Sequence, residues 1–260
     1  MFFLLSSPFL FFSFFFVVLL LALELGRRVR LREIRDKHDV EPARFNIMDG
    51  AVFGLMGLLL AFTFAAAGGR FESRRQLLVE EANAIGTAWL RLDLLPDSTR
   101  RPLQASFRQY VDARMTGYRA LPDTLVARRE FTRAAGMQQA IWSGAVAATE
   151  AAPTVAPSLL LLPALNAMFD IAAARMAAMR AHLPGVIFGL LCFLILCCGV
   201  LAGYGMTHSG PRNWLHTLGF ATVFVITLYV IVDYEYPRWG FINLESYDSP
   251  LVEVRQSMGD

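Results

Sequence analysis

Four apolar runs alternate with polar stretches along the chain, and they predict membrane-spanning helices. The first run, Phe2 to Leu23, is uncharged, dominated by Phe and Leu, and long enough to cross the hydrocarbon core as a helix. Neither a basic segment before it nor an A-x-A-like cleavage site after it indicates a signal peptide, so we expect it to be retained. The third and fourth runs extend from Val186 to Met206 and from Trp214 to Val232.

The second run, Asp49 to Arg70, carries a stripe of small residues. Their spacings of four, three, four, four and three place them on one helical face, and no charge occurs from Ala51 to Ala67. Lipid tails are as apolar as Leu, so helices in a bilayer associate through close packing, which small residues allow. The stripe predicts close contact within one subunit, between subunits or along a pore, and it consists of Gly50, Gly54, Gly57, Ala61, Ala65 and Gly68.

Beyond Gly68 and Gly69, a possible hinge, the pattern continues as a polar helix. Apolar residues recur every seven positions until Pro96, with Arg74, Glu81 and Ala88 on the neighbouring seam. Further helices are predicted from Asp97 or Ser98 to about Leu121, from Pro122 and Asp123 to the TEAAPTVAPS segment, and from Leu159 to His182. We expect a bundle of about four helices, whose first helix has the apolar heptad residues Phe71, Leu78, Ile85 and Leu92.

These segments predict an all-α integral membrane protein. It has four transmembrane helices, with a helical extramembrane bundle inserted between the second and the third. The expected domains are residues 1–69 for the first two spans and their connector, 70–183 for the bundle, 184–233 for the last two spans, and 234–260 for a C-terminal tail.

The connector between the first two spans is strongly basic, and the positive-inside rule predicts that it is cytoplasmic. With four spans, the bundle and the tail then lie on the non-cytoplasmic side of the membrane. The connector's basic residues are Arg27, Arg28, Arg30, Arg32, Arg35, Lys37 and Arg44.

Composition agrees with a membrane protein, because 55% of the residues are hydrophobic and 21 are Phe. The formal net charge of +2 gives no reason to expect nucleic-acid binding. Three cysteines, Cys192, Cys197 and Cys198, lie in one apolar run, and Cys192 does not share a helical face with the other two. They indicate buried small residues, with neither a disulfide framework nor a metal site, so we expect no cofactor.

Catalytic motifs are not found, since the sequence contains no H-E-x-x-H, G-x-S-x-G or Walker lysine pattern. Gly203, Gly205 and Gly210 resemble a phosphate-binding loop, but no strand precedes them, so we interpret them as an ordinary loop. The four histidines have no ligand spacing, and we do not expect an enzyme; they are His38, His182, His208 and His216.

Acidic residues near span ends are candidates for attracting ions. Asp49, just before the second span, either caps this helix or interacts with its dipole or, in an oligomer, contributes to an acidic ring at a pore mouth. Asp233 and Glu235, beside Arg238, either form a salt bridge within an aromatic interfacial belt or bind cations. A third group, Asn166, Asp170 and Arg175, is expected to form a structural polar network on one helix of the bundle.

Five segments together resemble the bacterial bestrophin-like membrane proteins: DGAVFGLMGLLLAF, RRQLLVEEANAIGTAWLRLDLLP, LPALNAMFDIAAAR, AHLPG and DYEYPRWGFINL. The resemblance covers about Asp49 to Val254, and EANAIGTAWLRLDLLP is its most specific part. It implies an oligomeric ion channel in the bacterial inner membrane, with the second span lining the pore. The acidic run that forms the bestrophin calcium clasp is not recognisable in this sequence, so the resemblance implies neither calcium activation nor anion selectivity.

Two hypotheses remain open. The first is a homo-oligomeric channel in the lipid bilayer that conducts inorganic ions, with Phe53 or Phe62 as a hydrophobic gate. The second is a non-conducting scaffold or sensor whose bundle binds a partner. The residues expected to line a pore or to pack helices are Gly50, Phe53, Gly54, Gly57, Ala61 and Phe62.

Overall fold

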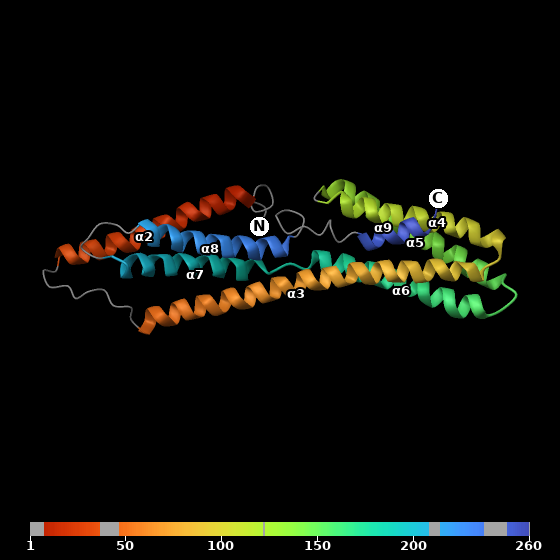
Figure 1. The fold of residues 1–260 in the computed structure, drawn as a ribbon, viewed down its shortest axis with the longest axis horizontal. Coiled ribbons are helices and arrows are strands. Elements are labelled where there is room, and N and C mark those ends of the chain that lie inside the picture. The colour runs from red at the N-terminus through yellow and green to blue at the C-terminus, as the bar shows by residue number, and fades with distance from the viewer. Residues whose placement is uncertain (1–7, 37–46, 122, 208–213, 237–248, 260) are drawn as a thin grey trace. The chain divides into compact units, whose positions relative to one another are not determined.

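The chain is all-helical in the computed structural model, which describes residues 8–36, 47–121, 123–207, 214–236 and 249–259 (Figure 1). Within these ranges no strand occurs, in agreement with the predicted all-α fold. The helices are α2 (Pro8–Asp36), α3 (Ile47–Arg91), the 3-10 turn η1 (Leu92–Leu94), α4 (Asp97–Arg119), α5 (Thr124–Glu150), α6 (Ala156–Arg180), α7 (Gly185–Gly205), α8 (Trp214–Glu235) and α9 (Ser249–Ser257).

Two compact units divide the chain. One contains Met1–Gly69 and His182–Glu235, and the other contains Arg70–Ala181 and Tyr236–Asp260. The helix α3 contributes to both, because it continues without interruption through Gly68 and Gly69. Four described segments are long and apolar enough to cross a membrane, namely Phe9–Asp36, Ile47–Leu94, Ala156–Gly205 and Trp214–Glu235.

In the first unit, α2 and α7 pack closely because glycines remove side chains from their contact. A Cβ atom at Gly26 would lie 1.9 Å from the carbonyl oxygen of Val200, and one at Gly203 would lie 2.0 Å from that of Leu23. Backbone atoms cannot move aside as side chains can, so both positions require glycine. The expectation of a loop here is wrong: Gly203 and Gly205 are helical, while Gly210 lies outside the described residues.

The helix α2 is longer at its polar end than the sequence predicted. The segment from Gly26 to Asp36, expected to be part of a connecting loop, continues the helix. Arg30 explains part of this extension, because it is buried and donates hydrogen bonds to Glu33 at 3.1 Å and to the Tyr204 hydroxyl at 3.2 Å. The remaining basic residues of the predicted connector, Lys37 and Arg44, lie outside the described residues.

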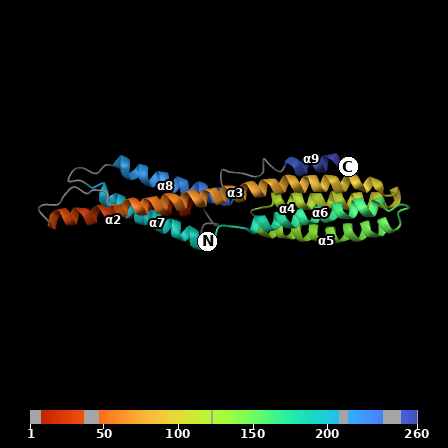
Figure 2. The same cartoon turned by 90° about the horizontal axis from the view of Figure 1, so that it is seen from below.

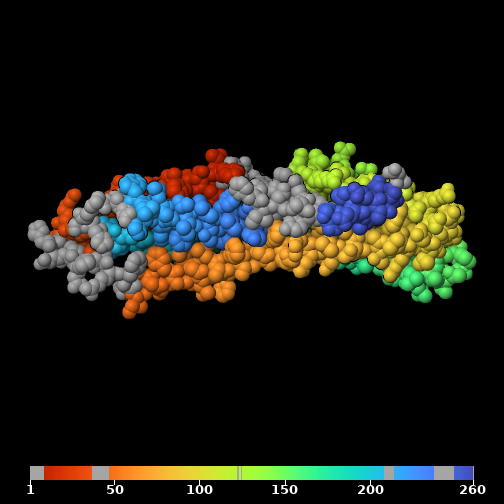
Figure 3. Space-filling model, viewed as in Figure 1, coloured from red at the N-terminus to blue at the C-terminus, as the bar shows by residue number. Residues whose placement is uncertain are grey.

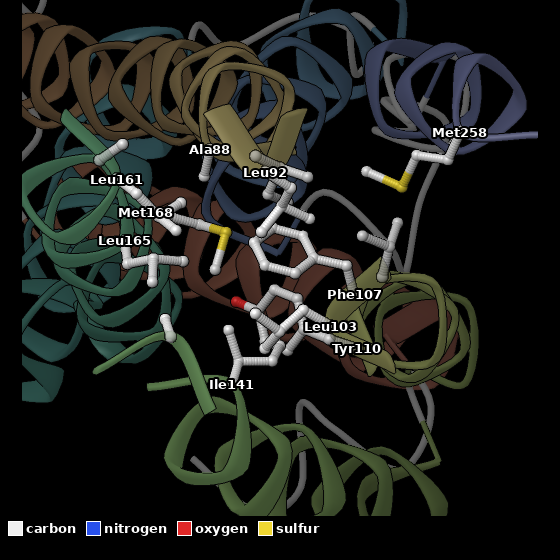
Figure 4. Close-up of a cluster of buried hydrophobic side chains, with 14 of the residues drawn as sticks. Ala88, Leu92, Leu103, Phe107, Tyr110, Ile141, Leu161, Leu165, Met168 and Met258 are labelled. Carbon is white, nitrogen blue, oxygen red and sulfur yellow. The ribbon is translucent and has the colours of Figure 1, made fainter. Parts of the chain in front are cut away.

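The second unit is a helical bundle in which α4, α5 and α6 lie beside the polar part of α3 (Figure 2). Leu78, Ile85 and Leu92 are fully buried, as their seven-residue spacing predicted. Their neighbours in the core come from all four helices, and Figure 4 shows how these side chains converge around Phe107 and Tyr110. The apolar periodicity of the sequence therefore gave the correct interior face of α3.

Helix boundaries in the bundle follow the sequence signals. The helix α4 begins at Asp97, directly after Pro96. The side chain of Asp123 caps α5 by accepting hydrogen bonds from the backbone nitrogens of Leu125 and Val126, at 3.1 and 3.2 Å. The predicted start at Pro122 lies outside the described residues.

The sequence analysis did not predict α9, and it assigned residues 234–260 to a tail. This helix packs on α4 and appears as a dark blue segment on the surface in Figure 3. Leu251 and Met258 are buried in the bundle core. Asp112 also holds α9 through an ion pair with Arg255, at 2.8 Å between carboxylate oxygen and guanidinium nitrogen.

Candidate functional site

The small-residue stripe of α3 lies on the face of that helix that its own subunit leaves exposed. Gly50, Gly54, Gly57 and Ala61 are all exposed. The buried residues Met56, Thr63 and Ala67 occupy a different side of the helix, and Met56 and Ala67 belong to the core of the first unit. At 100° per residue, the centre of the stripe lies roughly 140° around the helix from the centre of the buried side.

The surroundings of the glycines in the stripe also indicate that this face of α3 is exposed. A Cβ atom added at Gly50, Gly54 or Gly57 would meet nothing within 4 Å. Among the described residues, packing within one subunit therefore does not use these glycines, and one of the predicted alternatives is not observed. The close contact between α2 and α7 instead uses Gly26, Gly199 and Gly203, a set that the sequence analysis missed.

The two phenylalanines expected to act as a gate have different surroundings. The Phe53 ring packs edge-on against Phe220 of α8, with ring centroids 6.5 Å apart. Phe62 is 65% exposed and lies roughly 105° around the helix from the centre of the stripe. Of the two rings, Phe62 is the more exposed, whereas Phe53 is half-buried against α8.

Asp49 lies within the first turn of α3, because the helix begins two residues earlier at Ile47. The sequence analysis placed it before the helix as a cap. A carboxylate in the first turn interacts favourably with the exposed backbone amides and the positive end of the helix dipole.

Asp233 and Glu235, the other candidate ion-attracting residues, are both buried at the end of α8. The Glu235 carboxylate accepts a hydrogen bond of 2.6 Å from the backbone nitrogen of Leu183, and His182 Nδ1 lies 3.5 Å from the same oxygen. Glu235 thus anchors the segment that precedes α7. The neighbouring Arg238, with which a salt bridge was expected, lies outside the described residues.

A buried polar network in the bundle centres on Glu81, which is completely inaccessible to solvent. Arg114 Nε donates to one carboxylate oxygen at 2.7 Å, and Arg175 Nη1 donates to the other at 2.6 Å. The Tyr118 hydroxyl donates to the second oxygen at 3.3 Å, and its ring lies 3.5 Å below the Arg175 guanidinium. One carboxylate from α3 therefore joins helices α4 and α6.

The phenol of Tyr118 stays protonated in this network. Burial, followed by the negative charge of Glu81, raises the pKa of Tyr118. The prediction for this region was partly wrong, because Arg175 takes part whereas Asn166 and Asp170 are exposed. The sequence feature that could have indicated this network is the position of Glu81 on the seam beside the apolar heptad residues, since a buried carboxylate requires a partner.

In the part of the chain that the structure describes, no group of three His, Cys, Asp or Glu residues is arranged to hold a metal ion. Cys192, Cys197 and Cys198 are free thiols, and Cys198 is fully buried. His182 is near Glu235, whereas His38 and His208 lie outside the described ranges.

Four candidate spans and an all-helical fold define a multi-pass membrane protein. The family profile described as the Bestrophin-like domain matches residues 13–246. The chain therefore belongs to the bestrophin-like family, which confirms the resemblance found in the sequence.

A solved structure has the same fold. It is the crystal structure of a bacterial bestrophin homologue from Klebsiella pneumoniae in which one tryptophan is replaced by alanine. The TM-score is 0.73 and the sequence identity 12%, and the match covers 97% of each chain. No curated protein matches the sequence.

Proposed function

We propose that this protein is a homo-oligomeric ion channel in which α3 lies near the symmetry axis. The observation that carries this proposal is the exposed stripe of Gly50, Gly54, Gly57 and Ala61 in a member of the bestrophin-like family. Membrane helices with small residues on one face approach each other closely, and this face has no partner within the described part of its own subunit. Copies of the chain around an axis would supply that partner.

In this proposal, α2, α3, α7 and α8 cross the bacterial inner membrane. The bundle between the second and third spans lies outside the bilayer, on the non-cytoplasmic side, as a vestibule for inorganic ions. Phe62 is the hydrophobic gate, because its ring is exposed on the same span as the stripe. Asp49 of each subunit contributes to an acidic ring that raises the local cation concentration.

Reconstitution of the purified chain into liposomes tests this function by measuring flux of potassium, sodium, calcium and chloride. We expect flux in wild type, a larger flux in Phe62→Ala, and a lower cation preference in Asp49→Asn. Gly54→Leu should weaken association or block the pore. Leu60→Ala, at a half-buried position of the same helix, should have a smaller effect on association and on flux.

The matched control for the gate is Phe53→Ala. This change removes an aromatic ring of the same helix that packs against Phe220, so it should reduce stability without opening the pore. If wild type and Phe62→Ala both leak no faster than empty liposomes, the channel proposal fails and a non-conducting scaffold becomes the better explanation.

A further inference from the structure

One face of α2 changes from apolar to basic toward the C-terminal end of the helix. Its exposed residues recur at spacings of three and four, which keep them on one side of the helix. The apolar members are more than half exposed and the basic members follow directly. This face, the apolar-basic stripe, consists of Phe14, Val17, Leu21, Leu25, Arg28, Arg32 and Arg35.

Its apolar part is at least as long as one bilayer leaflet. From Phe14 to Leu25 the helix rises roughly 16 Å, and half of a hydrocarbon core is about 15 Å. Val29, which is 47% exposed, is the last apolar residue of α2 that is exposed. Arg32 and Arg35 follow it by roughly 4.5 Å and 9 Å along the helix axis. Their long side chains can therefore place guanidinium groups in the headgroup layer.

Acidic residues of α2 form ion pairs with its other arginines. Arg32 and Arg35 are therefore the arginines of this helix without an ion pair among the described residues. Glu24 forms ion pairs with Arg28, at 3.0 Å, and with Arg27, at 3.6 Å. Glu33 binds the buried Arg30 and therefore faces the interior. Asp36 is exposed beyond them.

Both Arg32 and Arg35 are exposed, and within the described part of the chain neither forms an ion pair. An exposed arginine with an uncommitted guanidinium group can donate two parallel hydrogen bonds to two oxygens of one phosphate group. The apolar side chains that precede it along the stripe match the acyl chains of the same lipid.

We propose that this stripe binds an anionic phospholipid, with the headgroup phosphate on Arg32 and Arg35 and the acyl chains along Leu25, Leu21 and Val17. Charge complementarity and the continuity of the apolar and basic parts on one face both favour this ligand. The inference rests on α2 alone and is independent of whether the protein conducts ions.

Native mass spectrometry of the full chain in detergent can test the site by titration with phosphatidylglycerol and with zwitterionic phosphatidylcholine. We expect tighter binding of phosphatidylglycerol, and a loss of roughly fivefold in its affinity for each arginine neutralised in Arg32→Gln and Arg35→Gln. Phosphatidylcholine binding should not change. Replacement of both residues by Lys, which keeps the charge but not the two parallel hydrogen bonds, should lower the preference for phosphatidylglycerol less than the Gln changes do.

The matched control is the double change Arg128→Gln and Arg129→Gln. It removes the same charge from exposed positions on α5 of the other unit. Equal phosphatidylglycerol affinity in wild type and in the α2 double variant overturns the proposal, as does an equal loss in the α5 control. A changed oligomeric state with unchanged lipid binding would assign the stripe to a second copy of the chain. Displacement of the lipid by millimolar inorganic phosphate would assign the arginines to free phosphate.

Discussion

Gly203 shows how one missing methyl group allows two helices to pack. Its ideal Cβ position lies 2.0 Å from a backbone oxygen of α2, a distance that requires the helices to separate. We expect Gly203→Ala to lower the free energy of unfolding by about 1–3 kcal/mol, the usual cost of overpacking a tight contact. Denaturant or thermal unfolding of the detergent-solubilised protein would measure it.

Gly189→Ala is the control for this change, because Gly189 lies on the same helix and a Cβ atom there would meet nothing within 4 Å. Alanine has the higher helix propensity, so this variant should be neutral or slightly more stable. Equal effects of the two substitutions would show that helix propensity, and not the contact with α2, determines the outcome.

Glycine spacing alone could not reveal which stripe packs within the subunit. Gly50 and Gly54 have the same four-residue separation as Gly199 and Gly203, yet only the second pair meets another backbone. Spacing gives the face of a helix on which small residues lie. The neighbour of that face depends on contacts between helices far apart in the sequence.

Helices α3, α4 and α6 are joined at one point, the carboxylate of Glu81. We expect Glu81→Gln to lower the stability of the bundle by about 3–5 kcal/mol, because it leaves the buried guanidinium groups of Arg114 and Arg175 without a counter-charge. Unfolding followed by circular dichroism, with hydrogen exchange to locate the change, would measure this loss.

Glu72→Gln provides the comparison on the same helix. Glu72 pairs with Arg75 at 2.9 Å, but both side chains are 44% exposed, so water and salt screen the pair. This variant should have almost wild-type stability. A similarly small effect of Glu81→Gln would mean that the buried network contributes little to holding the helices together.

Sequence periodicity predicted the helices of the bundle better than it predicted their polar contacts. Leu78 and Ile85 were placed correctly because an apolar heptad defines a buried face by itself. The partners of Glu81 are 33 and 94 residues away, and local spacing carries no information on such pairs. The polar end of α2 was missed because the apolar run stops at Leu23 although the helix does not, and α9 was missed because it contains no long apolar run.

Membrane orientation is a property of the whole chain and remains a prediction. The basic residues that follow the first span predict a cytoplasmic end for α2 and the opposite side for the bundle. A reporter fused after Asp36 should therefore report cytoplasm, whereas one inserted at Ala152, between α5 and α6, should report the other compartment. Both reporters in one compartment would contradict the four-span arrangement.

The position of α9 in the bundle core has a consequence for the order of synthesis. Leu251 and Met258 complete a core to which α4 also contributes, yet α7 and α8 are translated in between. At about 5–20 residues per second, the ribosome delivers α9 roughly 8–30 s after the start of α4. During that interval the nascent bundle exposes the apolar core residues that Leu251 and Met258 later cover, so it is open to aggregation or chaperone binding until α9 has been translated.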